Sequence, residues 1–199
     1  MISAAAVVIA FVLGSIPFGI VIGRGLFGID LRSQGSGNIG AANAFRSLPK
    51  WGAALVLIGD ALKGLLPVII AARLGVVSWA LVAVGLAAIL GHNYSIFLRG
   101  RGGKGVATGL GVLIALSPAA AGICVIVWIA GTLISGYSSV GSLLLNLAQP
   151  FALWWFTHDP AYVAFGVLAF LLAAWRHREN IDRLVHGQER SLFGRRTSP

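Results

Sequence analysis

Long apolar runs alternate with short polar segments along the chain, and the lengths of the runs predict membrane-spanning helices. A helix crosses the hydrocarbon core of a bilayer when it has about 20 mostly apolar residues. Runs of this kind lie at about 2–22, 51–72, 76–90, 106–134, 137–156 and 161–175. The run at 106–134 is too long for one untilted span at about 1.5 Å per residue. The pair Ser117-Pro118 within it predicts a break.

The basic residues indicate how many of these runs cross the membrane. They lie in three polar segments at about 24–50, 92–105 and 176–199. Basic residues of short loops stay in the cytoplasm. Seven spans put all three segments on that side, whereas six would put the last one opposite the others. We therefore predict an all-α polytopic membrane protein with seven transmembrane helices. Residues 1–199 would form a single domain, with the N-terminus outside and the C-terminus cytoplasmic.

Composition agrees with lipid as the main solvent of the chain. Of the 199 residues, 57% are hydrophobic and only 11% are charged, whereas soluble domains are about 45–50% apolar and about 25% charged. A net charge of +9 would suggest nucleic acid in a soluble protein. Here the charges cluster in loops, which favours anionic lipid or phosphorylated substrates and no nucleic acid. The single cysteine, Cys124, has no metal-ligand spacing, and we expect no metal or cofactor.

The first polar segment contains GSGNIGAANAFR, from Gly35 to Arg46. Its glycines match G-x-G-x-x-G, but no βαβ unit surrounds them, so a dinucleotide site is excluded. Glycines still let backbone N–H groups approach a phosphate, and serine, asparagine and arginine supply further donors. The alternative is a polar membrane loop with glycines at its turns. The predicted phosphate-binding residues are Gly35, Ser36, Gly37, Asn38, Gly40, Asn43 and Arg46.

The second polar segment contains GHNYSIFLRGRGGKGVATG, with the same glycine spacing and a lysine inside it. It is not a Walker A loop, because Gly105 stands where Ser or Thr would hold magnesium. Lys104 directly precedes a predicted helix, where a phosphate would meet an ammonium and free N–H groups. A cluster that only fixes topology is the alternative. The predicted binding residues are Gly100, Gly102, Gly103, Lys104 and Gly105.

Three further sets of ionisable or polar residues are candidates. His92 precedes the second loop and could be a general base or a structural residue. His177 and Asn180 would share one helix face, in a stretch that could otherwise hold anionic lipid. Asp60 and Lys63 lie within a predicted span, where ionisable groups are costly; they would support the site or contact the substrate.

Four motifs together resemble the bacterial acyl-phosphate:glycerol-3-phosphate acyltransferase family, PlsY. They are GSIPFG at 14–19, SGNIGAANAFR at 36–46, GHNYSIFLRGRGGKGVAT at 91–108 and RHRENIDRL at 176–184. The resemblance implies acyl transfer from acyl phosphate to the 1-hydroxyl of sn-glycerol 3-phosphate. This reaction gives lysophosphatidic acid and phosphate, and it is the first acylation of phospholipid biosynthesis. The donor would be neither acyl-CoA nor acyl carrier protein. The resemblance also implies a multi-pass bacterial inner-membrane protein with a cytoplasmic active site, and we expect it to work as a monomer.

The resemblance also implies residue roles. Ser36 and Arg46 match an essential serine and arginine, and Gly100 to Gly105 match a loop associated with glycerol 3-phosphate. His177 and Asn180 match functional positions, with Glu179 as a structural glutamate. Ala42 replaces the usual threonine, whose hydroxyl would otherwise be available to the substrate. The catalytic candidates are Ser36, Arg46, His92, Lys104, His177 and Asn180; the supporting ones are Asp60, Lys63 and Glu179.

Acyl phosphate is a mixed anhydride with a good leaving group, so direct transfer needs no protein nucleophile. Positioning and electrostatic stabilisation would supply most of the rate. The base could be His92, His177 or a substrate phosphate oxygen, and the sequence does not choose among them. Three other classes of protein compete with this interpretation: a transporter or channel for an organic phosphate, a thioester-dependent acyltransferase, and a lipid-binding scaffold.

Overall fold

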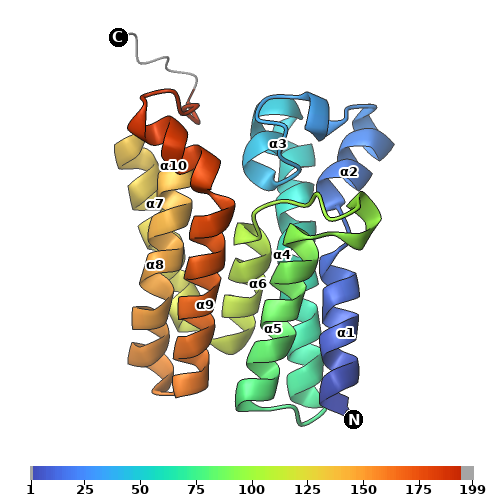
Figure 1. Ribbon diagram of the computed structural model, residues 1–199, viewed down its shortest axis with the longest axis vertical. Helices are drawn as coiled ribbons and strands as arrows, with labels where there is room; N and C mark the ends of the chain where they lie inside the picture. The colour runs from blue at the N-terminus through green and yellow to red at the C-terminus, as the bar shows by residue number, and fades with distance from the viewer. Residues whose placement is uncertain (1, 194–199) are drawn as a thin grey trace. The chain divides into compact units, whose positions relative to one another are not determined.

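The computed structural model describes residues 2–193, and every regular element in that part of the chain is a helix (Figure 1). The basic end of the third polar segment, including Arg195 and Arg196, lies outside the described residues. The chain divides into two compact units, Met1–Pro118 and Ala119–Pro199. The prediction of a single domain stays a prediction, and each unit is described by itself.

The first unit begins with an apolar segment that is broken near its middle. Helix α1 (Ile2–Gly14) and helix α2 (Phe18–Phe27) together make an apolar stretch of 26 residues, long enough to cross a membrane. Pro17 has no N–H to donate, so the helical hydrogen bonds stop between them. The chain continues through the short 3-10 helix η1 (Leu31–Ser33) to helix α3 (Ala41–Ser47).

Three further helices and a 3-10 turn complete the first unit. They are α4 (Lys50–Arg73), α5 (Ser78–Asn93), η2 (Ile96–Leu98) and α6 (Val106–Leu116). Glycines let these helices approach closely, as in membrane helix pairs generally. A side chain at Gly111 would overlap the Ala61 carbonyl of α4, and one at Gly14 would overlap the Ala88 carbonyl of α5. Small residues therefore set the spacing of α4 against α6 and of α1 against α5.

The described part of the second unit has four helices in sequence. They are α7 (Pro118–Ser135), α8 (Ser138–Thr157), α9 (Pro160–Arg176) and α10 (Arg178–Val185). The predicted break at Ser117-Pro118 is confirmed, since α6 ends at Leu116 and α7 begins at Pro118. Asp159 caps α9 by accepting a hydrogen bond from Ala161 N at 2.8 Å. Helix α10 turns by 60° from α9.

The helices confirm a polytopic membrane protein. Four segments are long and apolar enough to span, and a fifth qualifies if α9 and α10 are counted as one. Helix α6 is shorter, at 11 residues. Large apolar side chains are exposed along the spans, among them Ile58, Ile126 and Trp155, as expected for lipid-facing positions. Each predicted run contains a helix, but seven spans and their sidedness stay predictions.

Candidate functional site

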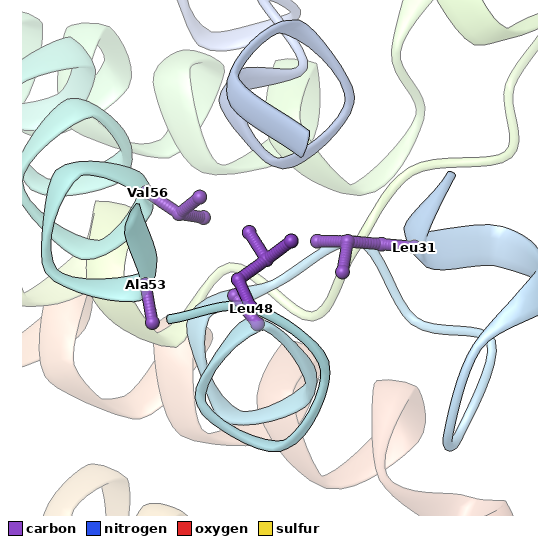
Figure 2. Packing of buried hydrophobic residues seen from close by; sticks show 5 residues of the cluster. Leu31, Leu48, Ala53 and Val56 are labelled. Carbon is purple, nitrogen blue, oxygen red and sulfur yellow. The ribbon is translucent and has the colours of Figure 1, made fainter. Parts of the chain in front are cut away.

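An apolar cluster anchors the first polar segment onto α4. Figure 2 shows four residues that lie together: Leu31 from η1, Leu48 directly after α3, and Ala53 and Val56 from α4. Burying a leucine side chain contributes about 1.5–3 kcal/mol. The cluster thereby fixes both ends of residues 28–40, which we call loop 1. Its buried members are Leu31, Ala44, Leu48, Ala53 and Val56, with Ile22, Phe27 and Ile29 packed against them.

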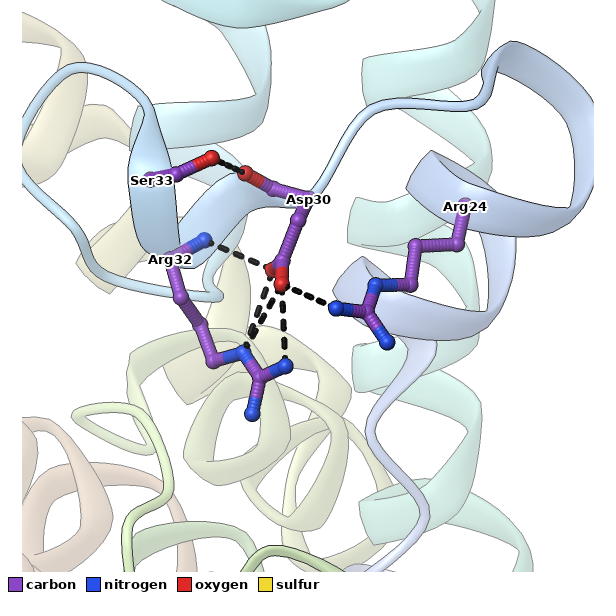
Figure 3. Close-up of polar contacts among 4 residues, drawn as sticks. All are labelled: Arg24, Asp30, Arg32 and Ser33. Atoms are coloured by element: carbon purple, nitrogen blue, oxygen red, sulfur yellow. Dashed lines mark hydrogen bonds and ion pairs between the residues drawn. The ribbon is translucent and has the colours of Figure 1, made fainter.

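An ion-pair cluster fixes the start of loop 1 (Figure 3). The carboxylate of Asp30 accepts from Arg24 Nη2 at 2.6 Å and from Arg32 Nη2 at 2.9 Å, and it also accepts from the Arg32 backbone N–H at 3.0 Å. The Arg32 guanidinium has the largest effect on Asp30 and lowers its pKa, and Arg24 lowers it further. Burial raises the pKa by less, so the pKa of Asp30 lies well below its usual range. Two basic residues of this segment therefore balance an acidic residue of the loop.

The side chain of Asn43 organises the interior of loop 1. It is 1% exposed, and its Oδ1 accepts from the Ser36 backbone N–H at 2.9 Å. Its Nδ2 donates to the carbonyls of Leu31 and Gln34 at 3.0 Å and of Asn38 at 2.8 Å. Gly35 has φ +52, and a side chain there would overlap Asn43 Oδ1. The loop is thus folded around one amide, with Ser36 exposed on its outside.

Loop 1 passes directly into α3. Gly40 caps this helix, and its N–H donates to Asn38 Oδ1 at 2.8 Å. Arg46 lies partly buried in the last turn of α3. Ala42, the position where the resembled family usually has threonine, is exposed in the first turn. The first unit therefore holds Ser36 and Arg46 within one short loop and helix.

The second glycine-rich segment, residues 94–105, forms a loop that folds back on the end of α5. We call it loop 2. The N–H of Gly102 donates to the Asn93 carbonyl at 3.2 Å, and that of Gly103 donates to the His92 carbonyl at 3.1 Å. Gly105 has φ +80 and caps α6, so Lys104 immediately precedes a helix N-terminus, as predicted.

Asp60 and Lys63 pair with each other inside the first unit. Lys63 Nζ lies 2.7 Å from Asp60 Oδ1, and His92 Nδ1 lies 3.6 Å from the same oxygen. These three side chains are at most 3% exposed. His92 is therefore buried under loop 2, against the Asp60–Lys63 ion pair.

In the second unit, His177 and Asn180 lie where α9 meets α10. His177 Nδ1 lies 2.8 Å from the Ala173 carbonyl. Asn180 Nδ2 donates to Glu189 Oε1 at 2.6 Å. Glu189 also accepts from Ser139 Oγ at 2.8 Å and from Arg183 Nε at 2.9 Å. Burial raises the pKa of Glu189, but the hydrogen bonds from Asn180, Arg183 and Ser139 outweigh it and lower the pKa below its ordinary value.

The structure shows a second candidate for the supporting glutamate, and the role of Glu179 stays a prediction. Glu179 is exposed on α10, whereas the side chain of Glu189 is 6% exposed and ties three residues together. Sequence reasoning missed Glu189 because it follows the end of α10, beyond the face on which helical spacing places His177 and Asn180. Ser139, on α8, gave no sequence signal either, because serine is common in membrane helices.

The predicted site residues thus fall into two groups. The first unit contains the residues of loop 1 and α3, the Asp60, Lys63 and His92 cluster, and Gly100 to Gly105. The second unit contains His177, Glu179 and Asn180. The fold and these polar loops define a class: multi-pass helical membrane proteins that combine glycine-rich basic loops with buried polar side chains.

Comparison with known proteins identifies the family. The family model described as Glycerol-3-phosphate acyltransferase matches residues 4–187. A glycerol-3-phosphate acyltransferase of Rubrobacter xylanophilus is 45% identical over 95% of this chain and 94% of its own length. One of Rhodopseudomonas palustris is 46% identical over 93% of each chain. The chain therefore belongs to the glycerol-3-phosphate acyltransferase family known as PlsY.

Two solved structures agree with this assignment. A crystal structure of PlsY, described as an integral membrane glycerol 3-phosphate acyltransferase in its glycerol 3-phosphate form, matches with a TM-score of 0.90 and 41% identity. It covers 95% of this chain and 94% of that one. A second PlsY structure, in a lysophosphatidic acid form, matches with a TM-score of 0.89 and 40% identity. The chain is an acyltransferase enzyme and a multi-pass membrane protein of bacteria.

Proposed function

We propose that the protein transfers a fatty acyl group from acyl phosphate to the 1-hydroxyl of sn-glycerol 3-phosphate. The hydroxyl oxygen forms a bond to the acyl carbonyl carbon, the bond from that carbon to the phosphate oxygen breaks, and phosphate leaves. The products are 1-acyl-sn-glycerol 3-phosphate and phosphate, in the first acylation of phospholipid biosynthesis. The observation that supports this best is the family match over 4–187, which includes both glycine-rich loops.

Both substrates carry phosphate, and the first unit offers suitable donors. Ser36 and Arg46 would bind one phosphate through their side chains. Lys104 would bind the phosphate of glycerol 3-phosphate through its ammonium group, next to the N-terminus of α6. Because phosphate is already a good leaving group, holding the anions and the carbonyl in place supplies most of the rate.

Three groups are proposed as candidates for the proton acceptor: His92, His177 and a phosphate oxygen of the substrate. A backbone carbonyl only accepts hydrogen bonds, so the contact of His177 Nδ1 with the Ala173 carbonyl puts the proton on Nδ1. In the neutral ring Nε2 then has the lone pair of a base. Asn180 is held through its Nδ2 by Glu189 and would orient a hydroxyl through its oxygen.

We further propose seven spans, with the N-terminus outside and the polar segments 24–50, 92–105 and 176–199 in the cytoplasm. All three basic segments then face the cytoplasm of the inner membrane, as the positive-inside rule requires. The acyl chain would enter from the bilayer, and the protein would act as a monomer. Tagging each loop and testing its accessibility from either side of the membrane checks this topology.

A matched donor assay tests the proposed reaction. Purified protein in lipid receives labelled glycerol 3-phosphate with either palmitoyl phosphate or palmitoyl-CoA. We expect lysophosphatidic acid from palmitoyl phosphate alone. Product from the CoA ester alone would replace the proposal with a thioester-dependent reaction. If folded protein gives no product from either donor, uptake of labelled glycerol phosphate into vesicles would test the transporter alternative.

A further inference from the structure

The break between α1 and α2 exposes backbone carbonyls, and two distant side chains donate to them. Helix α1 ends at Gly14 and α2 begins at Phe18, so the carbonyls of Ser15 and Ile16 between them accept no i+4 helical hydrogen bond. Ser95 Oγ donates to the Ser15 carbonyl at 2.5 Å, and Lys63 Nζ donates to the Ile16 carbonyl at 2.7 Å. The break is therefore tied to loop 2 through Ser95 and to α4 through Lys63.

The charge on Lys63 is balanced within the same cluster. Its Nζ lies 2.7 Å from Asp60 Oδ1, and it also lies 5.9 Å from the centre of the Phe18 ring at the start of α2. Both charged side chains are almost wholly buried, at 3% and 2% exposure. Burying an ion pair costs free energy that hydrophobic residues of the same size would not cost. A contribution to stability therefore explains poorly why the protein has the buried Asp60–Lys63 ion pair.

Asp60 also faces His92, which touches loop 2 at two points. His92 Nδ1 lies 3.6 Å from Asp60 Oδ1. The carbonyl of His92 accepts from Gly103 N at 3.1 Å, and a side chain at Gly103 would overlap His92 Nε2. The imidazole thus fills the space between the Asp60 carboxylate and the residue that precedes Lys104. The orientation of this ring limits where that part of loop 2 can lie.

We infer that Lys63, Asp60 and His92 are positioning residues that act as one unit to set the place of Lys104. Lys63 holds the Asp60 carboxylate next to the break between α1 and α2. Asp60 then orients the His92 ring, and the ring packs against Gly103. This inference rests on the proposed function only in that Lys104 binds the phosphate of glycerol 3-phosphate. It assigns His92 to positioning, so no proton transfer to the substrate passes through it.

A paired variant separates positioning from stability. Asp60→Leu with Lys63→Met removes both charges and keeps the outlines of the side chains, so we expect the protein to stay folded, with no more loss of stability than the missing hydrogen bond from Lys63 to the Ile16 carbonyl causes. The His92 ring loses the carboxylate that faces it at 3.6 Å, and we expect the KM for glycerol 3-phosphate to rise at least about fivefold while the KM for the acyl donor stays within about twofold. A stable paired variant whose KM for glycerol 3-phosphate is unchanged overturns the inference.

A double-mutant cycle shows whether the effect passes through Lys104. The paired change is made in the wild type and in a Lys104→Ala background, and the two ratios of KM are compared. If the cluster acts through Lys104, the paired change has almost no further effect once that amine is gone. Equal ratios in both backgrounds contradict the inference.

His92→Leu provides a second route if the paired variant does not fold, because it leaves the Asp60–Lys63 ion pair intact. We expect the same selective rise in the KM for glycerol 3-phosphate, and an unchanged KM in folded protein overturns the inference. Thr132→Val is the matched control. It removes a buried hydroxyl from α7 and should change neither KM. All variants use whichever donor gives product with the wild type, so failure of the acyl phosphate proposal stays distinguishable.

Discussion

The side chain of Asn43 binds the backbone of Ser36: Oδ1 of Asn43 accepts a hydrogen bond from the Ser36 N–H at 2.9 Å, seven positions earlier in the chain. The same amide donates to three carbonyls around loop 1. The glycine spacing predicted that this segment would expose backbone donors, but the N–H groups of Ser36, Gly37 and Gly40 donate within the segment. The structure adds that a buried amide, rather than a regular element, keeps the segment in shape.

Replacing Asn43 should therefore unfold loop 1 as well as reduce activity. We expect Asn43→Ala to cost about 1–3 kcal/mol of stability, because several buried backbone groups lose their partner. The value of kcat/KM should fall at least about tenfold, through displacement of Ser36. Thermal unfolding in detergent and steady-state kinetics check both effects. Gln34→Ala is the control, since Gln34 meets Asn43 through its backbone carbonyl. Lost activity with unchanged stability would instead mean that Asn43 contacts substrate directly.

Arg46 and Lys104 should matter far more than basic residues elsewhere. Hydrogen bonds to charged groups contribute about 1.5–3 kcal/mol, so we expect Arg46→Ala and Lys104→Ala each to lower kcat/KM by about 10- to 100-fold. Arg195→Ala removes the same charge near the end of the chain and should leave kcat/KM nearly unchanged. Initial rates at varied glycerol 3-phosphate and varied acyl donor give both constants. Equal, mild losses in all three variants would remove the phosphate roles from Arg46 and Lys104.

Glu189 should make the stability of the second unit depend on pH. Its pKa is lower in the folded protein, because Asn180, Arg183 and Ser139 donate to the ionised carboxylate. The contribution is therefore fully present above the ordinary glutamate pKa of about 4.3, and it is lost as pH falls through the lower, folded pKa. We expect Glu189→Gln to lower the unfolding temperature at pH 7 and to differ less from the wild type as the pH falls from about 5 to about 3.

The matched control for Glu189 is Glu179→Gln on α10. Glu179 is exposed, so its substitution should leave the unfolding temperature and the pH dependence unchanged. Melting curves of both variants across the pH range give the comparison. If Glu179→Gln destabilises the protein and Glu189→Gln does not, Glu179 is the supporting glutamate and Glu189 is not.

The sequence by itself determined the membrane class, the helices and the family. Apolar runs of span length have no other stable solvent than lipid, and in lipid the backbone must satisfy its own hydrogen bonds. The glycine spacing and the break at Ser117-Pro118 are likewise local signals, because each depends only on residues that are neighbours in the sequence. The proline of GSIPFG, Pro17, is a local signal of the same kind, but the sequence analysis did not predict that the first apolar run is broken there into α1 and α2.

Only the tertiary structure decided which polar residues act on one another. Lys63 reaches a carbonyl 47 positions away, Ser95 reaches one 80 positions away, and Glu189 joins α10 to Ser139, 50 positions earlier. The periodicity of a single sequence does not indicate such pairs, because the packing of the helices determines which side chains meet. Glu189 was not predicted for that reason: helical spacing relates neighbours on one helix, whereas this buried and paired carboxylate follows the end of α10.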